Sequence, residues 1–150
     1  AFNMLPPRQA EKITFDTDVN SYNCYGYALN RKTTLSPTGS GVIGYNVEKV
    51  FEGVVKDVGS ENIRRLNSMN DPINDDEYMV ALRVGFFDYH FMVKDQPNAL
   101  PESKYTWSHK RGSSEVEKYV MYDDSTAWDF GLFAKYDSDI IYFALQKNWE

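Results

Sequence analysis

Residues 47–58 show the apolar spacing of an amphipathic α-helix. Six apolar side chains follow the i, i+3, i+4, i+7, i+8, i+11 pattern of one helical face, and they are Val47, Val50, Phe51, Val54, Val55 and Val58. Charged residues take most of the remaining positions. We predict that this helix ends at Gly59 and that its valines lie in the core. Ser60 is a candidate N-cap for a shorter helix that runs through Ile63 and Leu66.

After the acidic segment 70–77, the apolar spacing changes to a period of two, which is typical of half-buried strands. Five segments show this alternation, namely residues 79–87, 88–95, 105–110, 115–123 and 139–145. Residues 12–16 indicate a further short strand near the N-terminus. Helices followed by consecutive strands predict an α+β fold, in which N-terminal helices pack on a C-terminal antiparallel sheet of about five strands.

The length of 150 residues predicts a single domain that spans residues 1–150. No repeat or Gly/Ser linker divides the chain, and its apolar runs are far shorter than the about 20 residues of a transmembrane helix. The aromatic content of 15% indicates a folded protein. The net charge of −6 provides no positive field for a phosphate backbone. We therefore expect neither a nucleic acid nor a membrane as partner, and we expect a monomer.

Cys24 is the only cysteine of the chain, so an intrachain disulfide is excluded. We predict a short helix that begins at or just before Cys24 and ends near Asn30. Three polar residues are candidate N-caps for it, namely Asp18, Asn20 and Ser21. The start of a helix lowers the pKa of a thiol, so we expect a lowered pKa for Cys24. Gly26 has no side chain and lets another backbone segment or a substrate approach closely. The alternative is an inert core thiol, because free cysteines are often buried.

The chain has two histidines, and both fall in predicted strands. Alternation places His90 on the strand face opposite Tyr89 and Phe91, and it places His109 on one face with Trp107. If the strands of residues 88–95 and 105–110 pair, the two imidazoles can lie close together. This arrangement is typical of thiol hydrolases, which combine a cysteine at a helix start with a histidine on a strand and a polar residue on the next strand.

In such a site, His90 takes the thiol proton and the thiolate of Cys24 attacks a carbonyl carbon. A third polar group orients the imidazole, and the backbone N–H of Cys24 donates to the developing oxyanion. His109 is the alternative base, and Asp123 or Asp124 would then orient it. The order of the residues along the chain favours His90.

Residues 23–29, NCYGYAL, resemble the nucleophile motif of the NlpC-type cell-wall peptidases and amidases, a family of the papain-like cysteine hydrolase superfamily. In that motif, Asp-Cys-Ser-Gly-aromatic opens the catalytic helix; here Asn23 replaces Asp, Tyr25 replaces Ser, and no HxG follows the first histidine. The resemblance implies that Cys24 is the nucleophile, that His90 is the base and that His109 orients it. It also implies a papain-like fold and cleavage of amide bonds in cell-wall peptides.

We therefore expect a cysteine peptidase or amidase that acts on a peptidoglycan-stem or protein substrate, secreted or at the cell envelope. Relatives of this arrangement also serve as toxin or effector domains that cleave or deamidate proteins. Because the chain starts at Ala1, we expect a processed form or an excised domain, which fits such a use. The alternative is a non-catalytic protein- or carbohydrate-binding module in which Cys24 is buried. Four residues beside the thiol and the histidines are candidates for the oxyanion hole or the cleft, namely Asn23, Tyr22, Tyr25 and Trp107.

No cofactor or metal is expected. The acidic residues of 71–77 lack the spaced pattern of a calcium loop. One cysteine and two distant histidines lack the close spacing of zinc ligands. The glycine-rich residues 39–44 do not form a phosphate-loop motif.

Overall fold

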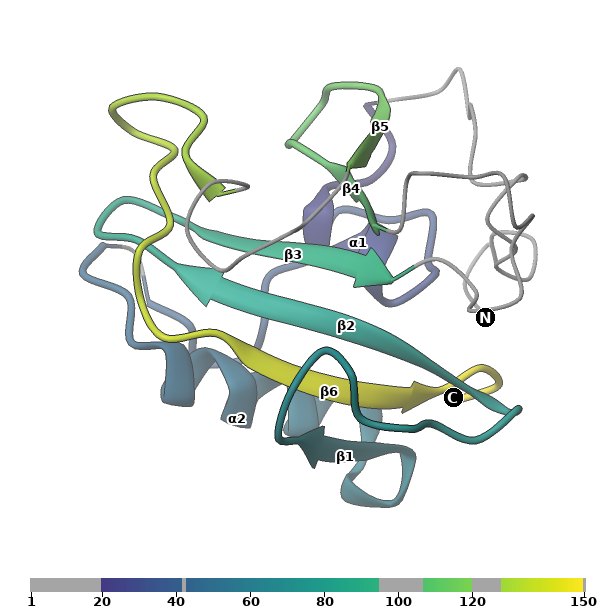
Figure 1. Ribbon diagram of the computed structural model, residues 1–150. Helices are drawn as coiled ribbons and strands as arrows, with labels where there is room; N and C mark the ends of the chain where they lie inside the picture. Colours follow the sequence, from purple (N-terminus) through teal and green to yellow (C-terminus); the bar gives the residue numbers. More distant parts are fainter. Residues whose placement is uncertain (1–19, 42, 95–106, 120–127, 150) are drawn as a thin grey trace.

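The computed structural model describes residues 20–41, 43–94, 107–119 and 128–149. A six-stranded sheet forms the centre of the molecule, in the order β1-β6-β2-β3-β4-β5, and neighbouring strands in this order pair antiparallel (Figure 1). The strands are β1 (Ile63–Leu66), β2 (Glu77–Val84), β3 (Tyr89–Lys94), β4 (Trp107–Lys110), β5 (Val116–Tyr119) and β6 (Ile141–Gln146). The α+β class is confirmed, and each of the five predicted segments contributes a strand.

The sixth strand is β1, and it corrects the prediction of a helix through residues 60–66. Only Ser60–Asn62 forms a single 3₁₀ turn, η2, and the chain then pairs with β6, so that Leu66 lies opposite Tyr142. The four residues Ile63–Leu66 are apolar only at their two ends, a pattern that fits a helix and a strand equally well. Hydrogen bonding to the edge of β6 makes this segment a strand. The strand predicted for residues 12–16 lies outside the described residues.

Helix α2 spans Val47–Val58, as the apolar spacing predicts. The side chain of Asn46 caps its first turn by accepting a hydrogen bond from the Lys49 amide at 3.1 Å. Gly59 ends the helix with a φ of 90°, a conformation that glycine adopts without strain.

Helix α1 is short, Cys24–Ala28, and all five of its residues are buried. Its N-cap is Asn23 rather than one of the three earlier polar residues, and Asn23 Oδ1 accepts from the Gly26 amide at 2.9 Å. A Cβ atom on Gly26 would collide with the carbonyl oxygen of Thr33. The glycine therefore admits a neighbouring backbone segment of this chain.

The two faces of the sheet are covered differently (Figure 1). Helices α1 and α2 pack on one face, where Val50 and Val54 lie in one apolar cluster with Phe91 and Phe143. The opposite face carries a second cluster, to which the segment 128–142 contributes Trp128 and other aromatic side chains. No helix in the described part of the chain is both long and apolar enough to cross a membrane.

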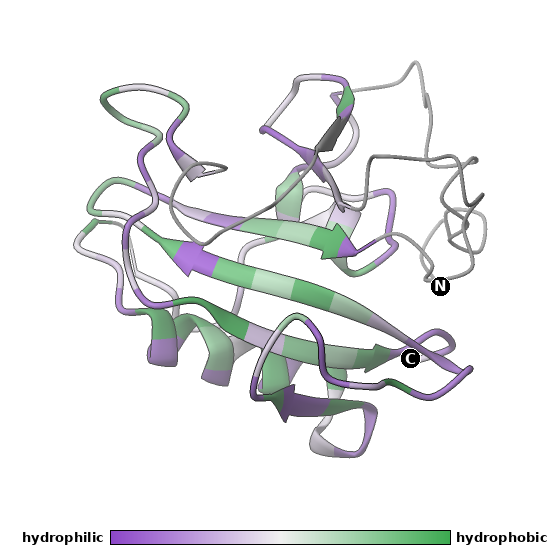
Figure 2. Ribbon diagram, viewed as in Figure 1, coloured by the Kyte–Doolittle hydropathy of each residue, from purple (hydrophilic) through white to green (hydrophobic). Residues whose placement is uncertain are grey.

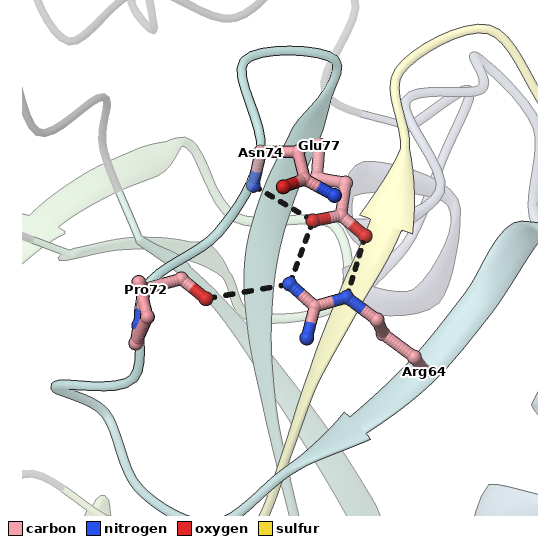
Figure 3. Close-up of polar contacts among 4 residues, drawn as sticks. All are labelled: Arg64, Pro72, Asn74 and Glu77. Carbon is pink, nitrogen blue, oxygen red and sulfur yellow. Dashed lines mark hydrogen bonds and ion pairs between the residues drawn. The ribbon is translucent and has the colours of Figure 1, made fainter.

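An ion pair fixes β1 against the start of β2 (Figure 3). Arg64 donates from Nε and Nη2 to the two carboxylate oxygens of Glu77, both at 2.9 Å, and from Nη2 to the carbonyl of Pro72 at 3.3 Å. The Asn74 amide donates to the same carboxylate at 2.8 Å. These donors lower the pKa of Glu77, whose side chain is buried. The network therefore holds the loop before β2 in place.

Replacing Glu77 by glutamine should lower the free energy of unfolding at pH 7 by about 1–2 kcal/mol, because a neutral amide accepts fewer hydrogen bonds from Arg64 and the Asn74 amide. Urea unfolding followed by circular dichroism measures the change. Glu48→Gln is the matched control, since Glu48 pairs with Arg65 at 2.7 Å but both side chains are about half exposed. It should cost about 0.5 kcal/mol or less. Equal losses in the two variants would contradict the role assigned to the buried Glu77 carboxylate.

Candidate active site

A pocket of about 310 Å³ lies where the start of α1 meets the β2–β3 turn. Segments from four parts of the chain line it, and the lining residues are Asn23, Cys24, Asp88, Tyr89, His90, Arg111, Gly112, Ala134 and Tyr136. The fold thus brings Cys24 and His90 into the walls of one pocket. His109 does not line the pocket, but it contacts His90 from β4.

Cys24 is the first residue of α1 and is 7% exposed. Its thiol lies 4.0 Å from the carbonyl oxygen of Tyr89, the residue before His90. In the described part of the chain, no hydrogen bond joins Sγ to an imidazole. Burial, followed by the nearby Asp88 carboxylate, raises the pKa of Cys24 to about 12. The predicted lowering of this pKa by the helix start is therefore wrong.

The correction has a physical cause. The backbone amides near the thiol, including those of Cys24, Tyr25 and Phe91, do lower its pKa, as a helix start should. Their effect is smaller than the cost of placing a thiolate in a buried position beside a carboxylate. The resting thiol is consequently protonated at neutral pH.

The two histidines form a direct pair, as the predicted pairing of their strands implies. Nε2 of His90 lies 2.7 Å from Nδ1 of His109, and the ring planes are nearly perpendicular at 82°. The rings are almost fully buried, with exposed fractions of 2% and 0%. Burial, followed by the neighbouring His109, lowers the pKa of His90 well below its ordinary value, and burial lowers the pKa of His109 to about 4. Both imidazoles are therefore neutral at pH 7.

This pairing leaves one nitrogen of His90 for the pocket. When Nε2–H of His90 donates to His109, the lone pair lies on Nδ1 of His90. Nδ1 has no hydrogen-bond partner among the residues that the structure describes. A neutral imidazole with a free lone pair in the wall of a pocket can accept a proton.

Aromatic side chains from the segment 128–136 pack against the two imidazoles. Tyr136 stacks on His90 with ring centroids 5.1 Å apart, and Phe130 stacks on His109 at the same separation. The Tyr136 hydroxyl donates to Asp88 at 3.4 Å, which ties this segment to the β2–β3 turn. Sequence reasoning assigned no role to Tyr136, Phe130 or Arg111, because only the folded chain brings their segments to the histidines.

Of the four residues expected at the oxyanion hole or the cleft, Asn23 alone lines this pocket. Its side chain is occupied, since Oδ1 accepts from Gly26 and Nδ2 donates to the Leu35 carbonyl at 2.6 Å. It therefore caps α1 rather than offering a donor to an oxyanion.

The other three expected residues, Tyr22, Tyr25 and Trp107, are buried elsewhere. The Tyr25 hydroxyl donates to Asp57 of α2 at 2.6 Å, and Trp107 belongs to the apolar cluster on the opposite sheet face. Asp123 and Asp124, the alternative partners of His109, lie outside the described residues.

Within the residues that the structure describes, no group of three or more His, Cys, Asp or Glu side chains could hold a metal ion. No protein-family model matches the chain, and no curated protein or solved structure matches it either.

Proposed function

We propose that the chain is a cysteine hydrolase that cleaves an amide bond of a peptide or protein, with Cys24 as nucleophile and His90 as base. The observation that carries this proposal is the orientation of the histidine pair. His109 engages Nε2 of His90, so that Nδ1 remains for a pocket that Cys24 also lines. The resemblance of residues 23–29 to the NlpC-type motif supports the same assignment.

The reaction begins when the Cys24 side chain turns from the Tyr89 carbonyl toward the pocket. Nδ1 of His90 takes the thiol proton, and the sulfur bonds to the substrate carbonyl carbon. The amide N–H of Cys24, at the first position of α1, donates to the oxyanion. His90 then returns the proton to the leaving amine as the C–N bond breaks. Water adds to the thioester carbon and gives a proton to His90. The C–S bond then breaks, the acid leaves, and His90 returns the proton to the sulfur of Cys24.

His109 is the positioning residue of this mechanism. As the acceptor of the Nε2–H hydrogen bond, it fixes the tautomer in which Nδ1 of His90 carries the lone pair. When His90 becomes an imidazolium ion, the same hydrogen bond becomes charge-assisted and therefore stronger.

The burial of Cys24 favours a second candidate function, a non-catalytic binding module. A thiol with 7% exposure and a pKa raised to about 12 has the properties of a structural core residue. In that case the thiol should react independently of the histidines.

Alkylation by iodoacetamide distinguishes the two functions, because Cys24 is the only cysteine and the intact mass reports its modification directly. At pH 7.5 we expect the folded wild type to react at least about tenfold faster than His90→Gln, since the protonated thiol needs a base to react. Both chains should react at one rate in 6 M guanidinium chloride. Equally slow reaction of the two folded chains would identify Cys24 as a structural thiol.

A further inference from the structure

Four large apolar side chains are exposed at the tips of two neighbouring loops, and we call them the apolar rim. They are Phe86, Phe87, Leu132 and Phe133, and their exposed fractions lie between 47% and 82%. Both loop tips carry hydrophobic colour in Figure 2. The ring of Phe87 contacts Phe86 at 5.0 Å and Phe133 at 4.9 Å between centroids. The three phenylalanine rings are thus in continuous contact, and Leu132 directly precedes Phe133 in the chain.

The apolar rim borders the pocket of Cys24 and His90. Phe87 directly precedes Asp88, and Phe133 directly precedes Ala134, and both of these following residues line the pocket. The two loops touch, because a Cβ atom on Gly85 would collide with the carbonyl oxygen of Lys135. A molecule seated in the pocket therefore passes beside the rim.

The rim is more than scattered surface hydrophobicity. Single exposed apolar residues are common, but a contiguous group beside a pocket marks a binding surface. The side chains of the rim remain largely in water, so they add little to the stability of the fold. Their apolar area becomes useful when another apolar group covers it.

We propose that the apolar rim binds a large apolar side chain of a polypeptide substrate, close to the amide bond that enters the pocket. This inference rests on the proposed hydrolase function and deepens it by naming the substrate class. The pocket holds one carboxylate and one guanidinium group, from Asp88 and Arg111, which suits an uncharged peptide backbone. A cell-wall peptide with small and acidic side chains would leave the rim uncovered.

The charge of the chain disfavours the other occupants of an apolar surface. A net charge of −6 repels an anionic lipid surface and a second copy of the chain. A neutral apolar segment of an unfolded or extended protein has no such penalty.

The test combines cleavage and binding in the full chain. For cleavage, the enzyme is incubated with tryptic peptides of a whole-cell lysate and, separately, with purified peptidoglycan stem peptides, and mass spectrometry identifies the products. We expect cleavage sites in the lysate peptides to be enriched in Phe, Leu, Ile or Met at one fixed position. The Phe87→Ser, Phe133→Ser double variant should reduce this enrichment by about tenfold, whereas the Phe87→Tyr, Phe133→Tyr double variant, which keeps both rings, should retain it.

For binding, the same rim substitutions are placed in the Cys24→Ala chain. Two fluorescein-labelled heptapeptides that differ only in a central Phe or Ser are the probes. We expect the Phe peptide to bind about tenfold more tightly than the Ser peptide, and the serine rim to remove this difference. This readout needs no hydrolysis, so it tests the rim even if the proposed reaction fails.

Four results would overturn the inference. The first is cleavage without apolar preference, and the second is an unchanged preference or affinity difference in the serine rim. The third is cleavage of the stem peptides in preference to the lysate peptides. The fourth is a rim-dependent dimer in ultracentrifugation, or rim-dependent sedimentation with vesicles of phosphatidylcholine and phosphatidylglycerol (3:1). Absence of all cleavage together with rim-dependent peptide binding would instead reject the hydrolase and leave the rim as a peptide-binding surface.

Discussion

Substitution of Cys24 by alanine is expected to abolish amide hydrolysis and to leave the chain folded. Loss of the nucleophile in a hydrolase with a covalent intermediate lowers kcat by orders of magnitude, and we expect a loss of at least about 10³-fold here. The stability should fall by only about 1 kcal/mol, because the substitution removes a single sulfur atom at the wall of a pocket.

Two measurements on each variant separate catalysis from folding. Hydrolysis of the lysate peptides gives the activity, and urea unfolding gives the free energy of unfolding. Cys24→Ser is the matched control for size, and it should also lose at least about 10³-fold in activity, because a hydroxyl is a far weaker nucleophile than a thiol at neutral pH. Activity retained in either variant would remove Cys24 from the reaction. Failure of both variants to fold would assign the thiol to the core.

The elements of this fold could be predicted because their patterns are long or strongly periodic. The valine stripe of α2 and the alternation in β2, β3 and β6 each cover at least six residues, and all four elements are found where expected. β1 was missed because four residues show too little of a period, so that pairing with β6 decides its structure.

The sequence predicted that the two histidines can lie close together, but it did not predict the electrostatics around Cys24. The sequence predicted that the imidazoles of His90 and His109 can lie close together if their strands pair, and β3 and β4 do pair, with the two rings in direct contact. The pKa of Cys24 could not be predicted in the same way. A helix start favours a thiolate, but the opposing burial depends on α1 packing against β3, which the motif itself does not show.

The aromatic surroundings of the histidines depend on contacts between distant segments. Phe130 and Tyr136 stack on imidazoles that lie some tens of residues earlier in the chain. The same holds for the apolar rim, since no local pattern indicates that Phe87 contacts Phe133. These contacts explain why a short aromatic-rich loop was not recognised as part of the site.

Lowering the pH from 7 to 4.5 should reduce the free energy of unfolding by about 3 kcal/mol, because the unfolded chain then binds protons that the folded chain excludes. The pKa of His109 is about 4 when folded, against an ordinary value of 6.5. Each unit of difference corresponds to about 1.4 kcal/mol between the two states. The stabilising effect is complete above the unfolded pKa and is lost as the pH falls from about 6.5 toward the folded pKa. His90, whose pKa is also lowered, adds to the loss.

Two carboxyl groups with shifted pKa values, Asp88 and Glu77, also contribute to the pH dependence of stability. Burial raises the pKa of Asp88, so protonation of this carboxyl in the folded chain adds stability as the pH falls. The lowered pKa of Glu77 acts in the same direction as the histidines, but mainly below its ordinary value of 4.5. Because the chain contains only two histidines, the slope between pH 7 and pH 5 reports mainly on their pair.

Urea unfolding of the wild type and of His109→Gln across this pH range measures the slope. A glutamine amide is neutral at every pH and still offers hydrogen-bonding groups to His90. We therefore expect a clearly flatter dependence in the variant, even if its stability at pH 7 is lower. A wild-type stability that stays constant from pH 7 to pH 4.5 would mean that the folded chain takes up protons at these imidazoles as readily as the unfolded chain. The two imidazoles would then be charged in mildly acidic solution, which would contradict the lowered pKa values of the buried pair.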